Sequence, residues 1–178
     1  MVIKIAIIIV IVFVIYVAAL YNTFVRLKHK IKQAKSSIDV YLTQRFDLIP
    51  NLVECVKAYA RYEESVYTKI AELRSKYNEN KDLETGKELN SHCNNLLAVG
   101  EANPDLKASE QFLNLQKALI KMESQLQAAR RVYNGDVTLY NTTISTFPNN
   151  VFAGFFGFSS VDLFEIEEYK KENIKVDL

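Results

Sequence analysis

An uninterrupted apolar run near the N-terminus constrains this chain more than any other feature of its sequence. The run "IAIIIVIVFVIYVAAL" spans Ile5–Leu20 without a charged residue, and residues 2–3 extend it beyond Lys4. A transmembrane helix needs about 20 apolar residues, a length that this run reaches if the Lys4 ammonium extends toward the lipid headgroups. Val17–Ala19 would also serve as a signal-peptide cleavage site, but the run is longer than the apolar core of a typical signal peptide. We therefore expect residues 1–21 to form a transmembrane anchor.

The charges that flank this run predict how the chain is oriented in a bacterial membrane. Lys4 and the terminal amine precede the run, whereas a group of basic residues follows it: Arg26, Lys28, Lys30, Lys32 and Lys35. Basic residues collect on the cytoplasmic side of a membrane helix. We therefore expect a single-pass protein of the inner (cytoplasmic) membrane, with its N-terminus outside and its C-terminal domain in the cytoplasm.

The composition of the remaining chain favours long helices and argues against several classes of function. Gly occurs 5 times and Pro 3 times in 178 residues, so few tight turns are available. The 22 Lys and Arg residues are balanced by 21 Asp and Glu residues, so bulk charge gives no support for binding nucleic acid through its phosphates. Cys55 and Cys93 form neither a CxxC pair nor a zinc-spaced set with histidine. We expect two reduced thiols in a helical core, no metal and no cofactor.

Apolar residues at spacings of three and four continue through most of the chain and predict an all-α fold. The first stripe, from Phe24 to Tyr41, has the heptad-like spacing of a coiled coil. It follows the apolar run without a break, which predicts one continuous helix to about Gln44. The same spacing predicts three further helices over residues 47–77, 83–101 and 106–147. Pro104 marks the break before the last of these, and Asn103 or Asp105 can cap the helix that follows.

The stretch "RFDLIPNLVE", residues 45–54, combines charged residues and a proline with helical spacing. Asp47 is suited to cap a new helix. Pro50 would then lie in the first turn, where the backbone N–H groups have no intrahelical acceptor and a missing N–H costs little. Pro50 therefore marks either a break between two helices or a kink in one.

Two sets of polar residues are the candidate functional residues of the helical part. The first set comprises Arg45, Asp47, Asn51 and Glu54, and the second comprises Arg130, Asn134 and Asn141. One hypothesis makes them a structural network that caps helices and fixes their register, with Arg45 and Glu54 reaching the long helix near Asn134. The other makes them the lining of a ligand pocket between helices. The Tyr-Asn dipeptide occurs at 133–134 and again at 140–141, seven positions apart, so both copies share one helix face.

Residues 148–178 differ from the rest of the chain. A segment rich in Phe and Gly is followed by a charged tail, and its candidate membrane contacts are Phe152, Phe155, Phe156 and Phe158. The segment is too short to span a bilayer, and its apolar side chains would be unfavourable if they were fully exposed to water. We expect it either to contact lipid at the membrane surface or to cover the open end of the helices.

Several long motifs resemble the LemA family of bacterial membrane-anchored helical proteins. The resemblance is strongest in "RFDLIPNLVECVKAYARYE", and "NPDLKASEQFLNLQKAL" and "AARRVYNGDVTLYNTTISTFP" are similar to later blocks of the family. It implies an antiparallel four-helix bundle, here residues 22–147, behind one membrane anchor. It implies links to envelope biology, with one relative taking part in forming magnetosome membranes, and it brings no established enzymatic activity or catalytic residues.

These observations favour a membrane-tethered scaffold over an enzyme. The sequence lacks a phosphate-binding glycine loop, an HExxH motif and a nucleophile elbow. We expect the helices to present faces to envelope proteins, to membrane lipid and to further copies of the chain, giving a homo-oligomer. The alternative is a ligand-binding or sensory module built on the polar residues between the helices.

Overall fold

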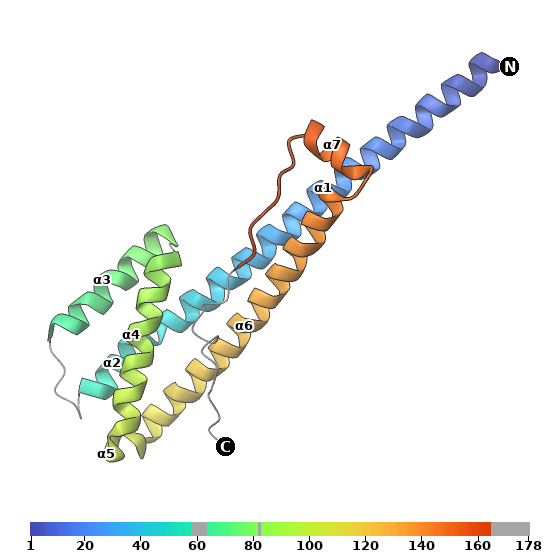
Figure 1. Cartoon of the computed structure of the whole chain (residues 1–178). Helices are drawn as coiled ribbons and strands as arrows, with labels where there is room; N and C mark the ends of the chain where they lie inside the picture. Colours follow the sequence, from blue (N-terminus) through green and yellow to red (C-terminus); the bar gives the residue numbers. More distant parts are fainter. Residues whose placement is uncertain (58–63, 82, 165–178) are drawn as a thin grey trace, which may run out of the picture. The chain divides into compact units, whose positions relative to one another are not determined.

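The computed structural model describes residues 1–57, 64–81 and 83–164, and within them the chain is helical, with no strand. The prediction of an all-α fold is therefore confirmed for the described residues. The helices are α1 (Val2–Asp47), α2 (Ile49–Lys57), α3 (Glu64–Asn80), α4 (Leu83–Ala102), α5 (Pro104–Lys107), α6 (Glu110–Ser145) and α7 (Asn149–Phe155) (Figure 1).

Helix α1 joins the apolar run to the first heptad-like stripe without interruption. It begins at Val2 and ends at Asp47, three residues beyond the predicted end near Gln44. Among the described residues, this helix is the one that is long and apolar enough to cross a membrane, judged by length and composition. Most side chains of its apolar run are exposed, including Val2 at 79% and Tyr16 at 42%, whereas Val17 and Leu20 are partly covered. Protein therefore covers little of this apolar surface.

The chain divides into two compact units. The first combines Met1–Ala34 with the described residues of Arg130–Leu178. It holds the apolar run, the C-terminal part of α6, α7 and the stretch that follows α7. Its buried side chains recur at helical spacing on both long helices: Phe24, Leu27 and Ile31 on α1, and Tyr133, Val137, Tyr140 and Ile144 on α6.

The second unit comprises Lys35–Ala129. Helix α4 packs against α2, α3 and α5 within it. The largest fully buried side chains come from every helix of the unit: Ile38, Phe46, Ile49, Leu52, Tyr77, Leu89, Leu96, Leu106, Phe112 and Leu119. The rings of Phe46 and Tyr77 meet edge to face, with their centroids 4.9 Å apart, a geometry that adds to the stabilisation from burying both.

Short interruptions separate the helices of the second unit. Leu48 alone lies between α1 and α2, and Pro50 occupies the first turn of α2, as predicted. Asn103 caps α5 by accepting a hydrogen bond from the N–H of Leu106, which confirms one of the two predicted caps of this break. The predicted helix over residues 106–147 is in fact two helices, α5 and α6, which Ala108 and Ser109 separate.

Candidate functional site

Two asparagines of α6 hold the stretch that follows α7 by its main chain. The carboxamide of Asn141 donates from Nδ2 to the carbonyl of Val161 (2.8 Å), and its Oδ1 accepts from the N–H of Val161 (3.0 Å). The carboxamide of Asn134 likewise donates from Nδ2 to the carbonyl of Phe164 (3.0 Å), and its Oδ1 accepts from the N–H of Phe164 (2.7 Å). Each carboxamide therefore satisfies both main-chain groups of one residue, as a neighbouring β-strand would.

Two tyrosines on the same face add hydrogen bonds to this stretch. The hydroxyl of Tyr140 donates to the carbonyl of Ser159 (3.0 Å), and that of Tyr133 donates to the carbonyl of Asp162 (3.3 Å). Burial raises the pKa of both phenols, so they remain protonated donors at neutral pH. We call Tyr133, Asn134, Tyr140 and Asn141 the Tyr-Asn face, and Ser159–Phe164 the C-terminal segment.

One side chain of the C-terminal segment is also recognised. The ring of Phe164 meets the ring of Tyr133 edge to face, with centroids 6.2 Å apart. The guanidinium of Arg130 lies over the Phe164 ring, 4.9 Å from its centroid, within the range of a cation–π contact. Three residues predicted as candidates from the sequence, Arg130, Asn134 and Asn141, thus contact one segment.

The Phe-rich segment packs against the apolar run of α1 and the helical turn that follows it. Figure 1 shows α7 beside α1. The ring of Phe152 contacts those of Phe13 and Tyr16, and Phe156 and Phe158 both contact Tyr21. Phe155, by contrast, is 83% exposed. An open apolar hollow of ≈ 490 Å³ lies between these elements, lined by Phe13, Val14, Val17, Ala18, Tyr21, Asn22 and Phe156.

Arg45, from the first polar set, lies in the second unit and is almost fully buried, with 5% of its surface exposed. Its guanidinium pairs with the carboxylate of Glu123 on α6 and donates to Oδ1 of Asn94 (3.1 Å) on α4. Arg45 therefore reaches the long helix at Glu123, and the prediction that it does so near Asn134 is wrong.

Asp47 and Glu54, from the same set, lie at the surface of the second unit. Asp47, predicted as the cap of the second helix, is instead the last residue of α1, because the first helix continues beyond Gln44. Its carboxylate accepts a hydrogen bond from Arg74 (2.8 Å). Glu54 is exposed on α2. The four residues of this set thus have different surroundings and do not form one network.

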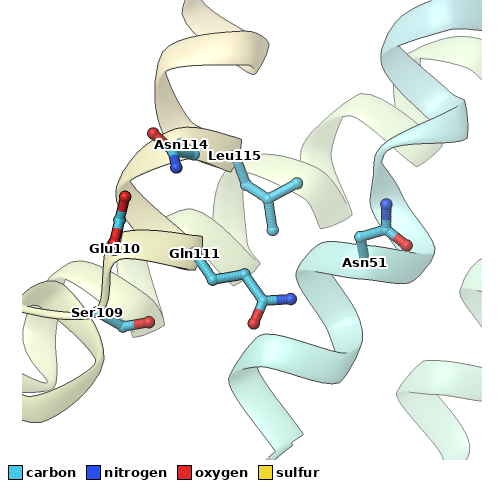
Figure 2. Close-up of a pocket in the computed structure, with 6 residues that line it drawn as sticks. All are labelled: Asn51, Ser109, Glu110, Gln111, Asn114 and Leu115. Atoms are coloured by element: carbon cyan, nitrogen blue, oxygen red, sulfur yellow. The ribbon is translucent and has the colours of Figure 1, made fainter.

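Asn51 borders an open hollow of ≈ 710 Å³ in the second unit. Figure 2 shows Asn51 on α2 facing α6, from which the side chains of Gln111 and Leu115 extend toward it. Ser109, Glu110 and Asn114 complete the lining. The hollow is mainly polar in residue type, and among the sequence-predicted candidates Asn51 lines it.

In the part of the chain that the structure describes, potential metal ligands do not cluster and both cysteines are buried. The described residues contain no group of three or more His, Cys, Asp or Glu side chains arranged to hold a metal ion. Cys55 and Cys93 are buried free thiols. Burial raises the pKa of the Cys93 thiol, and the nearby Arg45 offsets only part of this rise. The thiolate is the nucleophilic form of cysteine, so this rise in pKa works against nucleophilic reactivity at Cys93.

Comparison with known proteins shows the family to which this chain belongs. The LemA family model matches residues 34–178. The chain belongs to the LemA family. This confirms the resemblance that the motifs around Pro50, Pro104 and Tyr140 indicate.

Individual relatives agree with this assignment. The chain is similar to Protein LemA of Metamycoplasma hominis, with 27% identity over 158 residues, covering 86% of this chain and 72% of that protein. It is also similar to Magnetosome protein MamQ 2 of Paramagnetospirillum magneticum (23% over 175 residues, 82% of this chain). Magnetosome protein MamQ of Magnetospirillum gryphiswaldense is 22% identical over 174 residues, or 81% of this chain. The chain spans 64% of the length of both magnetosome relatives. Membership of the LemA family and the apolar N-terminal part of α1 both fit a membrane-associated helical protein.

Several residues of these sites carry no signal that sequence reasoning can detect. Glu123 and Asn94, the partners of Arg45, are single polar residues in helices that contain many others. The C-terminal segment is recognised mainly through its main chain, which every residue type offers. The recurring Tyr-Asn dipeptide indicated the correct helix face, but not what that face binds.

Proposed function

We propose that this LemA-family protein is a membrane-anchored helical scaffold that organises envelope proteins, and further copies of itself, at the cytoplasmic membrane. The observation that carries this proposal is the continuity of α1. The helix with the exposed apolar run also supplies buried residues to both units, including Phe24 and Phe46. A scaffold needs such a continuous link between the membrane and the surface that binds partners.

The proposed arrangement is an antiparallel four-helix bundle behind a single-pass anchor, with the N-terminus outside and the helical domain in the cytoplasm. The basic residues after the apolar run support this orientation. A reporter fused after Leu178 tests it. We expect a fluorescent protein that folds only in the cytoplasm to be active there, whereas activity of a fused periplasmic phosphatase would contradict the orientation.

Exposed apolar side chains support a contact of α7 with membrane lipid. Phe147, Val151 and Phe155 are 79%, 61% and 83% exposed, and α7 packs beside the apolar run through Phe152. Apolar surface of this kind is stable when it is covered by protein or lipid. We propose that α7 lies at the membrane surface with Phe155 directed into lipid.

Cross-linking in native membranes followed by mass spectrometry tests the scaffold. We expect reproducible cross-links from lysines of the helical units to envelope proteins and between copies of the chain. Cross-links confined to single copies, at a yield matching an unrelated single-pass control protein, would contradict the proposal.

A second candidate function is a ligand-binding or sensory module, favoured by the hollow at Asn51 (Figure 2). Amide and hydroxyl groups from Asn51, Ser109 and Gln111 would bind a small polar ligand there. Native mass spectrometry of the intact protein released from membranes tests this, because a bound metabolite adds a defined mass that Asn51→Leu/Gln111→Leu should remove.

A further inference from the structure

We propose that the Tyr-Asn face of α6 is a peptide-binding site, and that it takes the C-terminal segment of a second copy of this chain as well as its own. The inference rests on the self-association included in the proposed function, and it specifies the surface and the ligand. Its evidence is the set of hydrogen bonds that join the Tyr-Asn face to Ser159–Phe164.

The spacing of the two asparagines matches the repeat of an extended peptide. Asn134 and Asn141 are seven positions apart on α6, which is about 10.5 Å along a helix axis. Their partners, Val161 and Phe164, are three positions apart, which is about 9 Å along an extended chain with three residues per turn, in which residues three apart face the same side. Both carboxamides can therefore bind the main chain of one extended peptide without distorting either element.

The contacts define the class of ligand. Among the described residues, the carboxamides of both asparagines bind main-chain N–H and C=O groups, and both tyrosine hydroxyls donate to carbonyls. This is the main-chain recognition that sheet edges use for peptides, transferred to side chains of a helix. The ring at position 164 is the exception, because Tyr133 and Arg130 both contact it. The ligand is thus an extended peptide with free N–H groups at two positions three apart and an aromatic residue at the second.

A second copy of this chain offers that ligand with identical chemistry. The C-terminal segment is joined to α7 through Gly157, which is exposed, has φ +72° and has open space where a side chain would project. Rotation at a glycine is cheap, so Phe158 and the C-terminal segment can be redirected together to a neighbouring molecule, where the Phe158 ring would contact that copy's Tyr21 in place of its own. Exchange of one element between copies costs little, because each hydrogen bond broken within one copy is formed again with the other. Confinement of the copies to one membrane raises their effective concentration.

A complementation experiment with the full chain tests the inference. The face variant, Asn134→Leu/Asn141→Leu, loses the carboxamides but keeps its own segment. The segment variant, Val161→Pro/Phe164→Pro, loses the two N–H groups that donate to those carboxamides. The matched controls are Thr138→Leu/Thr142→Leu, at exposed positions of the same helix, and Ser160→Pro/Leu163→Pro, at exposed positions of the same segment.

Two differently tagged copies are co-expressed, extracted in mild detergent and purified through one tag. We expect co-purification of wild-type with wild-type and of each control with itself. The face variant and the segment variant should each lose co-purification with themselves by about tenfold or more, since several hydrogen bonds are removed together. Co-expression of the face variant with the segment variant should restore it, because one intact face then meets one intact segment.

The outcomes separate this inference from the proposed scaffold. If wild-type and both variants self-associate equally, the scaffold stands and exchange of the C-terminal segment is wrong. If wild-type does not self-associate, both self-association and exchange are wrong. If both variants lose association and the mixed pair does not regain it, exchange is again wrong.

A labelled synthetic peptide provides a measurement that does not depend on oligomers. The probe is fluorescein-GFSSVDLF, the sequence of residues 157–164, added to the full-length segment variant in detergent. We expect saturable binding, followed by fluorescence anisotropy, that Asn141→Leu reduces by about tenfold or more. Absence of saturable binding would overturn the assignment of the Tyr-Asn face as a peptide-binding site.

Discussion

Gly100 on α4 approaches the ring of Phe112 on α6 so closely that a methyl group added to Gly100 would lie 2.3 Å from two ring carbons. Phe112 is fully buried, so its ring has little room to move. We predict that Gly100→Ala lowers the free energy of unfolding by about 1–3 kcal/mol, the usual cost of overpacking a core. Chemical denaturation of the detergent-solubilised protein, followed by circular dichroism, measures this change.

Gly135 provides the matched control for Gly100. It lies inside α6, is exposed, and has nothing within 4 Å of the position that a methyl group would take. Gly135→Ala should therefore stabilise the protein by about 0.5–1 kcal/mol, through better helix propensity alone. Equal effects of the two substitutions would show that the contact with Phe112 is unimportant.

The buried ion pair of Arg45 and Glu123 predicts an asymmetric response to mutation. Arg45 is 5% exposed, so removing Glu123 leaves a buried guanidinium without its carboxylate partner. We expect Glu123→Ala to destabilise the protein by about 3 kcal/mol, whereas Arg45→Met/Glu123→Met should remain close to wild-type. Thermal unfolding of the three proteins measures the difference.

The pair formed by Asp47 and Arg74 is the control for this prediction. Its side chains are 53% and 38% exposed, respectively, and water screens their attraction. Asp47→Ala/Arg74→Ala should change stability by less than about 1 kcal/mol. A loss of stability as large as that caused by Glu123→Ala would mean that burial of the charges does not determine how much stability an ion pair contributes.

Stability at high pH should depend on Tyr77. Burial raises the pKa of this phenol from its ordinary value of 10.0 to about 12, and Asp39 adds to the rise. The folded state therefore keeps a proton that the unfolded state loses above pH 10. Stability that is fully present below pH 10 should be lost as the pH rises through 12, by on the order of 2 kcal/mol. The urea midpoint, measured from pH 8 to 12, follows this loss.

The variant Tyr77→Phe isolates this effect. The buried hydroxyl of Tyr77 has no hydrogen-bond partner among the described residues, so its removal should leave stability at pH 8 unchanged or raise it by about 1 kcal/mol. The decline between pH 10 and 12 should become shallower in this variant. An identical decline in both proteins would assign the effect to other tyrosines.

The exposed position of Phe155 predicts its accessibility in a bilayer. We expect a nitroxide attached at Phe155→Cys, in full-length protein in nanodiscs, to be relaxed more strongly by oxygen than by a water-soluble nickel complex, as lipid contact requires. A label at Lys30→Cys, an exposed position in the basic stretch of α1, should show the opposite preference. The same preference at both positions would argue that α7 faces water.

Local sequence patterns predicted the elements of this fold better than its contacts. The spacing of apolar residues gave α4 to within one residue, and Asn103 before Pro104 gave the cap of α5. Such signals depend on neighbours in the sequence. Helix α7 was not predicted, because its seven residues, Asn149–Phe155, are too few to display a helical period.

The partners of the candidate residues could not be predicted in the same way. Periodicity placed Asn134 and Asn141 on one face, yet their partners are main-chain groups at Phe164 and Val161. Arg45 and Glu123 are separated by 78 positions, and the residues around each of them give no indication of its partner. Contacts of this kind are fixed by how helices pack, which a single sequence does not state.

Seven residues of α6 span about the same length as three residues of the C-terminal segment. This match should constrain insertions and deletions in the segment more strongly than substitutions. Substitutions at Ser160 or Leu163 leave the bound main-chain groups in place. An insertion or deletion between Val161 and Phe164 would instead move one of these groups by about 3 Å relative to its asparagine. Homologous segments can therefore diverge at the exposed positions, whereas the aromatic residue at 164 and the length between these two positions should stay fixed.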